Sequence, residues 1–210
     1  ASVVLTNDDL GNLVTAIASG RRIYTNIKKA VQYIISIHIP IILTVSLPLF
    51  LGWVYPQIFT PVHVIFLELV MGPTCSIVYE NEPMEKNTML RKPRPMTETF
   101  LNLRELVVSI IQGLVITLGV LFIYQMTARS GGSEELTRSM VFTTLIFSNI
   151  LLSFCNRSFF YTTFETLKNK NNLLIYVTLV TLAVLSLMIY FPPVSMFFKL
   201  QELSLMQVGT

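Results

Sequence analysis

Long uncharged apolar runs alternate with short polar segments along this chain of 210 residues. A membrane-crossing helix needs about 20 consecutive, mostly apolar residues. Five runs have this length, and the pattern predicts an all-α, polytopic membrane helix bundle with about five transmembrane helices. The predicted spans are residues 32–54, 61–79, 106–127, 139–155 and 173–191.

The first 31 residues have a different pattern from the rest. Asp8 and Asp9 are suited to begin a helix, and apolar residues follow them at helical spacing up to Val31. No helix-breaking residue separates this segment from the first span. We therefore expect two parts, a helical stalk over residues 1–31 and a membrane domain over residues 32–210.

The charged residues support this division and indicate how the chain is oriented in the membrane. Only 13% of the residues are charged, about half the fraction in a soluble domain, and the mean hydropathy is +0.63. Of the fifteen Lys and Arg residues, twelve precede span one or lie between spans two and three or spans four and five. The positive-inside rule makes that side cytoplasmic and predicts a cytoplasmic N-terminus.

Several functions are excluded by missing motifs. The sequence has no Walker-type loop, no Ser/His/Asp arrangement and no Cys/His cluster, and its charge pattern gives a nucleic-acid role no support. Cys75 and Cys155 both fall in predicted spans, where buried free thiols are the ordinary interpretation. This chain alone is predicted to bind no ATP, to hold no cofactor and to catalyse no reaction.

Glu68 is the only formally charged residue inside the predicted spans' apolar runs. A charge at membrane depth costs about 2.5–3.5 kcal/mol on insertion scales, so it usually faces a polar interior and has a function. Pro73 follows and has no N–H for the carbonyl of Leu69, which places a second oxygen ligand near the carboxylate. The alternative is a neutral carboxylic acid in a hydrogen bond between helices.

His38 and Pro40 form a similar feature in the first span. Pro40 frees the carbonyl of Ser36, although a plain kink explains the proline equally well. His38 is a proton carrier, a ligand or a hydrogen-bonded packing residue. The short outer loop predicts that His38 and Glu68 lie at similar depth, as in transporters with paired broken helices. Ser148 and Asn149 in the fourth span add polar groups able to face this site or to join helices.

Several segments resemble P-type cation-transporting ATPases, over essentially the whole chain. The N-terminal residues 1–10 (ASVVLTNDDL) and 17–29 (IASGRRIYTNIKK) are similar to the stretch that leads from the family's phosphorylation domain into its fifth transmembrane helix. Later similarities lie in residues 61–70 (PVHVIFLELV), 91–95 (RKPRP), 147–149 (FSN) and 198–203 (FKLQEL).

The resemblance implies that the five spans are family helices five to nine, and that helices five, six and eight supply cation ligands. His38 falls where calcium pumps have an amide ligand, Asn149 where they have a carboxylate, and Glu68 at or near a helix-six ligand. Two acidic positions differ, because Ile41 replaces the helix-five acid and no second acid follows Glu68. We therefore predict a site of Glu68, His38, Asn149, Ser36, Leu69 and Ser148.

The expected function is the cation-binding and translocation part of an ATP-driven pump. Calcium is the cation that the family implies, although one carboxylate and one histidine suit a proton or a single cation better than two calcium ions. The chain is expected to be a fragment of a larger parent protein in a bacterial plasma membrane. Its expected partners are the lipid bilayer, the parent's remaining helices and the parent's cytoplasmic domains, which bind Mg-ATP. The alternatives are a passive or secondary transport module with Glu68 as relay, and a degenerate fragment without transport.

Overall fold

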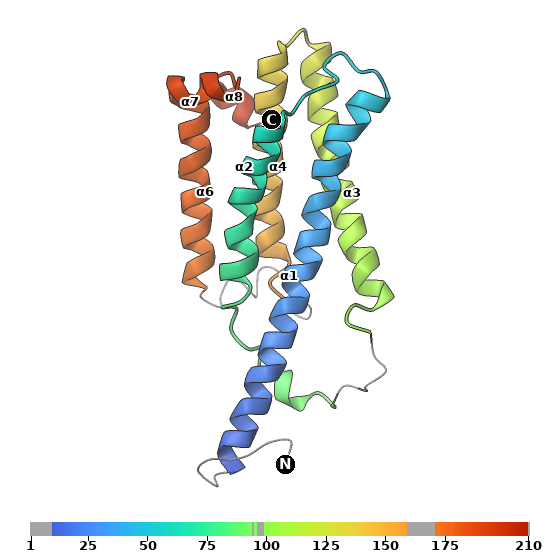
Figure 1. Ribbon diagram of the computed structural model, residues 1–210, viewed down its shortest axis with the longest axis vertical. Coiled ribbons are helices and arrows are strands. Elements are labelled where there is room, and N and C mark those ends of the chain that lie inside the picture. Colours follow the sequence, from blue (N-terminus) through green and yellow to red (C-terminus); the bar gives the residue numbers. More distant parts are fainter. Residues whose placement is uncertain (1–9, 94, 96–98, 159–170, 210) are drawn as a thin grey trace.

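The computed structural model describes residues 10–93, 95, 99–158 and 171–209. Its helices stand roughly side by side, and one of them extends well beyond the others as a stalk (Figure 1). The elements are α1 (Leu10–Phe50), α2 (Pro61–Pro73), the π-helix η1 (Thr74–Val78), the 3-10 helix η2 (Thr88–Leu90), α3 (Leu103–Arg129), α4 (Glu134–Cys155), α6 (Asn172–Tyr190), α7 (Pro192–Phe197) and α8 (Leu205–Val208).

The predicted fold class is confirmed. Within the described residues, five helical segments are long and apolar enough to cross a membrane: residues 11–50, 61–78, 103–129, 134–155 and 172–190. The spans differ in how much of the protein covers them. The most apolar part of α4 is 61% buried, whereas 28% is buried for α3 and for α6. Helix α4 is therefore central, and the others present apolar faces to their surroundings.

Helix α1 is one continuous α-helix of 41 residues that includes both Pro40 and Pro48. At 1.5 Å per residue it is about 60 Å long, which exceeds the thickness of a bilayer. The helical break expected near Pro40 is thus not formed, because a single missing N–H leaves the flanking turns intact. The predicted capping residues Asp8 and Asp9 lie outside the described residues.

Helix α1 packs chiefly against α3, and α3 packs in turn against α4. The two helices come close together at Gly113 of α3, where a Cβ atom would lie 2.8 Å from both the Ser36 carbonyl oxygen and the Cβ of Ile39. Only a residue without a side chain allows this approach. The loop of residues 51–60 joins α1 to α2, yet α1 makes more of its contacts with α3 than with α2.

Local signals fix the starts of the later helices. Asn102 forms a capping box with Glu105 at the start of α3, with both hydrogen bonds 2.9 Å long. The side chains of Ser133 and Asn171 accept hydrogen bonds from backbone N–H groups in the first turns of α4 and α6. These caps place the helix ends at the predicted polar segments.

The segment between η1 and α3 folds back onto the stalk. Arg21 of α1 donates hydrogen bonds to the carbonyls of Thr88 and Arg91, at 3.0 and 2.8 Å. The amide of Asn26 donates to the carbonyls of Glu80 and Glu82. These contacts attach the described residues of this segment to the stalk.

Buried ion pairs complete this attachment. Lys29 lies 3.0 Å from Glu85, with side chains only 1% and 7% exposed. Glu82 pairs with Arg157 at 2.9 Å and accepts a hydrogen bond of 2.6 Å from Asn171. One loop thus connects the stalk with the end of α4 and the start of α6.

Candidate cation site

His38 and Glu68 meet across the gap between α1 and α2. Nε2 of His38 lies 3.1 Å from Oε1 of Glu68, and Nδ1 of the same ring lies 2.8 Å from the carbonyl oxygen of Ile34. A carbonyl only accepts, so Nδ1 carries a hydrogen. Nε2 can then donate to the carboxylate only as an imidazolium, whereas a neutral ring requires a protonated Glu68. Either way, this geometry holds one acidic proton between the two residues.

The pair lies on the open side of the bundle. The side chains of His38 and Glu68 are 40% and 46% exposed, and their apolar neighbours Ile42, Ile65 and Leu69 are exposed as well. No described part of the chain covers this face. An ionisable pair facing hydrocarbon would be costly, so the position calls for a further covering element.

The backbone geometry of α2 changes just after Glu68. The α-helix ends at Pro73 and continues as the π-helical turn η1, in which the N–H of Tyr79 bonds to the carbonyl of Thr74. Pro73 supplies no N–H to the carbonyl of Leu69, one residue from the carboxylate. The predicted irregularity in this span is therefore present, and it adds a polar backbone atom beside the pair.

Ser36 faces away from the pair. Residues two apart in an α-helix differ by about 200° in direction, so Ser36 and His38 point to opposite sides of α1. The Ser36 hydroxyl donates to Gln112 of α3 at 3.1 Å, and its carbonyl faces Gly113. The structure therefore places this predicted ligand in the α1–α3 interface rather than beside Glu68.

Asn149 occupies a second polar location, inside the bundle. It is 8% exposed, and its Oδ1 accepts a hydrogen bond of 3.5 Å from the hydroxyl of Tyr33. Both residues line a small cavity of about 10 Å³ together with Thr74 and Thr181. That volume suits about one water molecule. Ser148, the neighbour of Asn149, is partly exposed and does not line this cavity.

The predicted site residues thus occupy two locations, and two of them, Ser36 and Ser148, belong to neither. His38, Glu68 and the Leu69 backbone lie together, Asn149 lies in the inner cavity, and Ser36 belongs to a helix interface. The convergence of His38 and Glu68 was predicted correctly. The role of each residue in binding a cation remains a prediction.

Polar residues that were not predicted from the sequence complete the inner group. Tyr33, Thr74 and Thr181 face the cavity from α1, η1 and α6. Tyr33 precedes the buried Ile37 and Ile41 at four-residue spacing, which marks the inner face of α1. That periodicity was the available signal, and it separates Tyr33 from the face of His38.

The chemistry of the two locations differs. Within the described residues, no group of three or more His, Cys, Asp and Glu side chains is placed to hold a metal ion. A hard cation would need hydroxyl, amide and carbonyl oxygens in addition to the Glu68 carboxylate. The outer pair offers charge and an exchangeable proton, and the inner cavity offers neutral oxygens.

Comparisons with known proteins identify a family to which this chain is similar. A family model described as "Cation transporting ATPase, C-terminus" matches residues 56–210. The chain is 32% identical over 158 residues to Calcium-transporting ATPase 1 of Lactococcus lactis, which covers 75% of this chain and 18% of that protein.

Two further relatives cover all or nearly all of the chain. Calcium-transporting ATPase type 2C member 1 of Homo sapiens is 24% identical over 208 residues, 99% of this chain and 22% of that protein. Calcium-transporting ATPase 1 of Bacillus cereus is 26% identical over 224 aligned positions, 100% of this chain and 25% of that protein. The chain therefore spans between about a fifth and a quarter of the length of these relatives.

Proposed function

This chain belongs to the family of cation transporting ATPases, whose C-terminal part it matches, and we propose that it binds and translocates the cation of a larger pump. As part of that pump it is an integral membrane protein. The proposal rests on one observation, the His38–Glu68 pair held within two membrane-crossing helices on a face that the described chain leaves open. We propose that the parent's remaining transmembrane helices cover this face and complete the site.

The His38–Glu68 pair would couple the binding of a cation to the release of a proton. A cation that binds the Glu68 carboxylate competes with the proton shared by His38 and Glu68, because both need the same oxygen. Release of the cation would allow the proton to return. The central step of the proposed cycle is thus a change in the affinity of Glu68 for the cation. The carbonyl of Leu69, near Pro73, is a candidate additional ligand.

Calcium is the proposed cation, because the relatives are named calcium-transporting ATPases. Calcium prefers six to eight oxygen ligands. Glu68 and its neighbours provide only a few, so we propose that a single ion binds and that the parent supplies further oxygens. We assign Asn149 and the inner cavity to an accessory polar location that the cation or its hydration water occupies during transfer.

The stalk is proposed to transmit the energy of ATP. In this family, Mg-ATP phosphorylates an aspartate in a cytoplasmic domain. We propose that this domain belongs to a part of the parent outside this chain. Helix α1 is continuous from Leu10 to Phe50 and carries His38. A displacement of its cytoplasmic end would therefore move His38 relative to Glu68. The cytoplasmic N-terminus and the bacterial plasma membrane are part of the same proposal.

A second candidate is a passive or secondary transport module. It is favoured by the single carboxylate paired with a histidine, which suits a proton relay. In that case flux would follow the proton gradient without ATP. The two candidates are separated by whether vesicles containing the parent accumulate a cation only when ATP is supplied.

The test measures cation-stimulated ATPase activity of the purified parent with calcium, manganese, magnesium, sodium or potassium, over a range of pH. Wild type is compared with Glu68→Gln and with the control Glu80→Gln. Glu80 is exposed and lies beyond the end of η1, so its variant changes the same charge outside the site. We expect one cation to stimulate the wild type and Glu80→Gln, and Glu68→Gln to lose the response.

Two outcomes would contradict the proposal. Activity that depends on pH alone would mean that Glu68 carries a proton and that calcium is not the transported cation. Equal stimulation of wild type and Glu68→Gln would make the His38–Glu68 pair a structural contact.

A further inference from the structure

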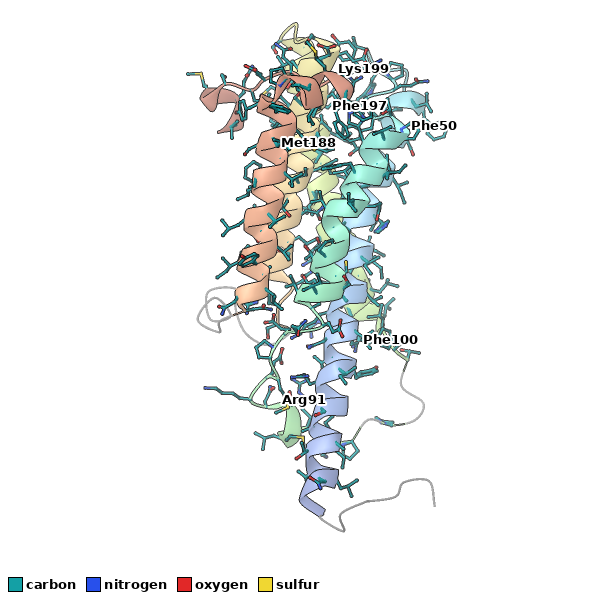
Figure 2. The ribbon with its side chains drawn as sticks, turned by 60° about the vertical axis from the view of Figure 1, so that its left-hand side comes forward. Phe50, Arg91, Phe100, Met188, Phe197 and Lys199 are labelled. Carbon is teal, nitrogen blue, oxygen red and sulfur yellow. The ribbon has the colours of Figure 1, made fainter. Side chains whose placement is uncertain are left out.

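A cavity of about 690 Å³ lies between the stalk and the segment that leads from η2 to α3. This is the size of a small-molecule site. Arg21, Tyr24 and Lys28 line it from one face of α1, because they follow one another at spacings of three and four residues. Figure 2 shows Arg91 and Phe100 of the opposing segment beside this part of the stalk.

The lining of this cavity is strongly basic. Among the described residues that line it, the charged ones are Arg21, Lys28, Arg91, Lys92 and a single carboxylate, Glu105. Lys28 is neutralised by Glu105 at 2.7 Å, and Arg91 is paired with Glu85 at 3.0 Å. Arg21 and Lys92 have no carboxylate partner in the part of the chain that the structure describes. Of the described residues, these two therefore bring positive charge to the cavity without a carboxylate partner.

Arg21 is also held in a fixed position. Its Nη1 donates to the carbonyls of Thr88 and Arg91, so one nitrogen of the guanidinium anchors the side chain. The remaining N–H groups are available on a planar group that suits bidentate contact with an oxyanion. The ring of Tyr24 is fixed by an edge contact with Phe100, with ring centroids 5.4 Å apart.

The geometry points to a binding site for a phosphate-bearing anion in this cavity, with Arg21 and Lys92 as its principal ligands. Oxyanions with several charges fit best, because two uncompensated cations face one volume. This site is distinct from the His38–Glu68 pair, because residues of the stalk and of the segment between η2 and α3 line it.

Two sources can supply such an anion, a soluble phosphate compound or the headgroup of an anionic lipid. The apolar run of α1 begins at Ala30, nine residues after Arg21. The two positions are therefore about 13 Å apart along the helix. The polar layer on each side of a bilayer is only about 5–7 Å thick. Arg21 is thus better placed for a soluble phosphate compound than for a simple phospholipid headgroup.

The test uses the full-length parent in phosphatidylcholine nanodiscs and follows hydrogen–deuterium exchange of residues 86–93. One arm adds pyrophosphate, with chloride at matched ionic strength as control. The other arm adds no soluble phosphate and replaces part of the lipid with phosphatidylglycerol. A local exchange signal separates this cavity from phosphate sites elsewhere in the parent.

Three variants locate the effect. Arg21→Gln and Lys92→Gln each remove a ligand, and Arg22→Gln removes one charge from the neighbouring exposed residue, which does not line the cavity. Lys92 is exposed and makes none of the stalk–loop contacts described above, so its variant tests the site even where Arg21→Gln loosens the loop. We expect each ligand variant to raise the half-saturating pyrophosphate concentration by about tenfold or more, as for loss of a charge-assisted hydrogen bond.

The result expected is saturable protection by pyrophosphate that Arg22→Gln leaves unchanged. Protection that appears only with phosphatidylglycerol, and that Lys92→Gln weakens, supports the same site with a lipid headgroup as its source. Protection in neither arm, or an equal loss in Arg22→Gln and Lys92→Gln, overturns the inference.

Discussion

Nε2 of His38 lies 3.1 Å from Oε1 of Glu68, while Nδ1 of the same ring is engaged with the carbonyl of Ile34 at 2.8 Å. This double engagement fixes the ring orientation and leaves one proton to be shared by the two side chains. The two residues are therefore expected to act as a unit, so that removing either disables both.

We expect Glu68→Gln, His38→Gln and the double variant to lose cation-stimulated ATPase activity of the parent to similar extents. Groups that act as a unit give strongly non-additive losses, with coupling of about 0.5–3 kcal/mol for residues in direct contact. The measurement is a double-mutant cycle on the stimulated rate. Losses that simply multiply in the double variant would show two independent roles.

The sequence was sufficient to predict the helices and the similar depth of His38 and Glu68. Apolar runs of membrane length identify the spans, and a charge inside such a run is rare enough to single out Glu68. The short outer loop then placed His38 at a similar depth. These inferences depend on chain length and composition, which are properties of the sequence itself.

The directions of side chains were predicted less well. Ser36 was grouped with His38 because Pro40 frees its carbonyl, but helical geometry turns Ser36 toward Gln112 and Gly113 of α3. Asn149 lies in a separate cavity with Tyr33, on the inner face of α1. Which side of each helix meets which neighbour depends on packing of all five spans, and a single apolar run carries little information about it.

The packing of α1 against α3 gives a stability prediction. Gly113→Ala would place a Cβ 2.8 Å from the Ser36 carbonyl oxygen and from Ile39, so the helices would have to separate. We expect a loss of about 1–3 kcal/mol, as for other overpacked interiors, measured by thermal unfolding of the parent in detergent.

The control for this prediction lies in the same helix. Gly119→Ala meets no atom within 4 Å and should be neutral, or stabilising by up to about 1 kcal/mol through helix propensity. Equal effects of the two substitutions would mean that helix propensity, and not the α1–α3 approach, determines the result.

The buried ion pair of Glu82 with Arg157 gives a second stability prediction. Their side chains are 5% and 3% exposed, and Asn171 also donates to Glu82. Removing one partner of a buried pair costs about 3–5 kcal/mol, because the other charge stays buried. We therefore expect Glu82→Gln to lower the melting temperature clearly and to increase amide exchange at the start of α6.

Glu80→Gln is the matched control, since Glu80 is two residues away and its side chain is exposed. It should leave both the melting temperature and the exchange of α6 unchanged. A similar response of the two variants would argue against a connection from the loop to α6 through Glu82.

The contact between Glu85 and the stalk is expected to depend on pH. Burial of the carboxyl acts to raise the pKa of Glu85. The ammonium of Lys29 and the hydrogen bonds from Ser158 and Arg91 lower the pKa by more than burial raises it, so the pKa lies below its ordinary value of 4.5. The folded state then binds fewer protons than the unfolded state. The contribution to stability is therefore complete above pH 4.5 and is lost as the pH falls through the lowered pKa.

Glu85→Gln removes the charge that faces Lys29 at every pH. The difference in melting temperature between wild type and this variant should be constant above pH 4.5 and should shrink below it, as the wild-type carboxylate becomes protonated. Glu80→Gln, measured over the same series, should show no such change. A difference that widens as the pH falls would have the wrong sign for a lowered pKa, and would mean that Glu85 is not held as a carboxylate against Lys29.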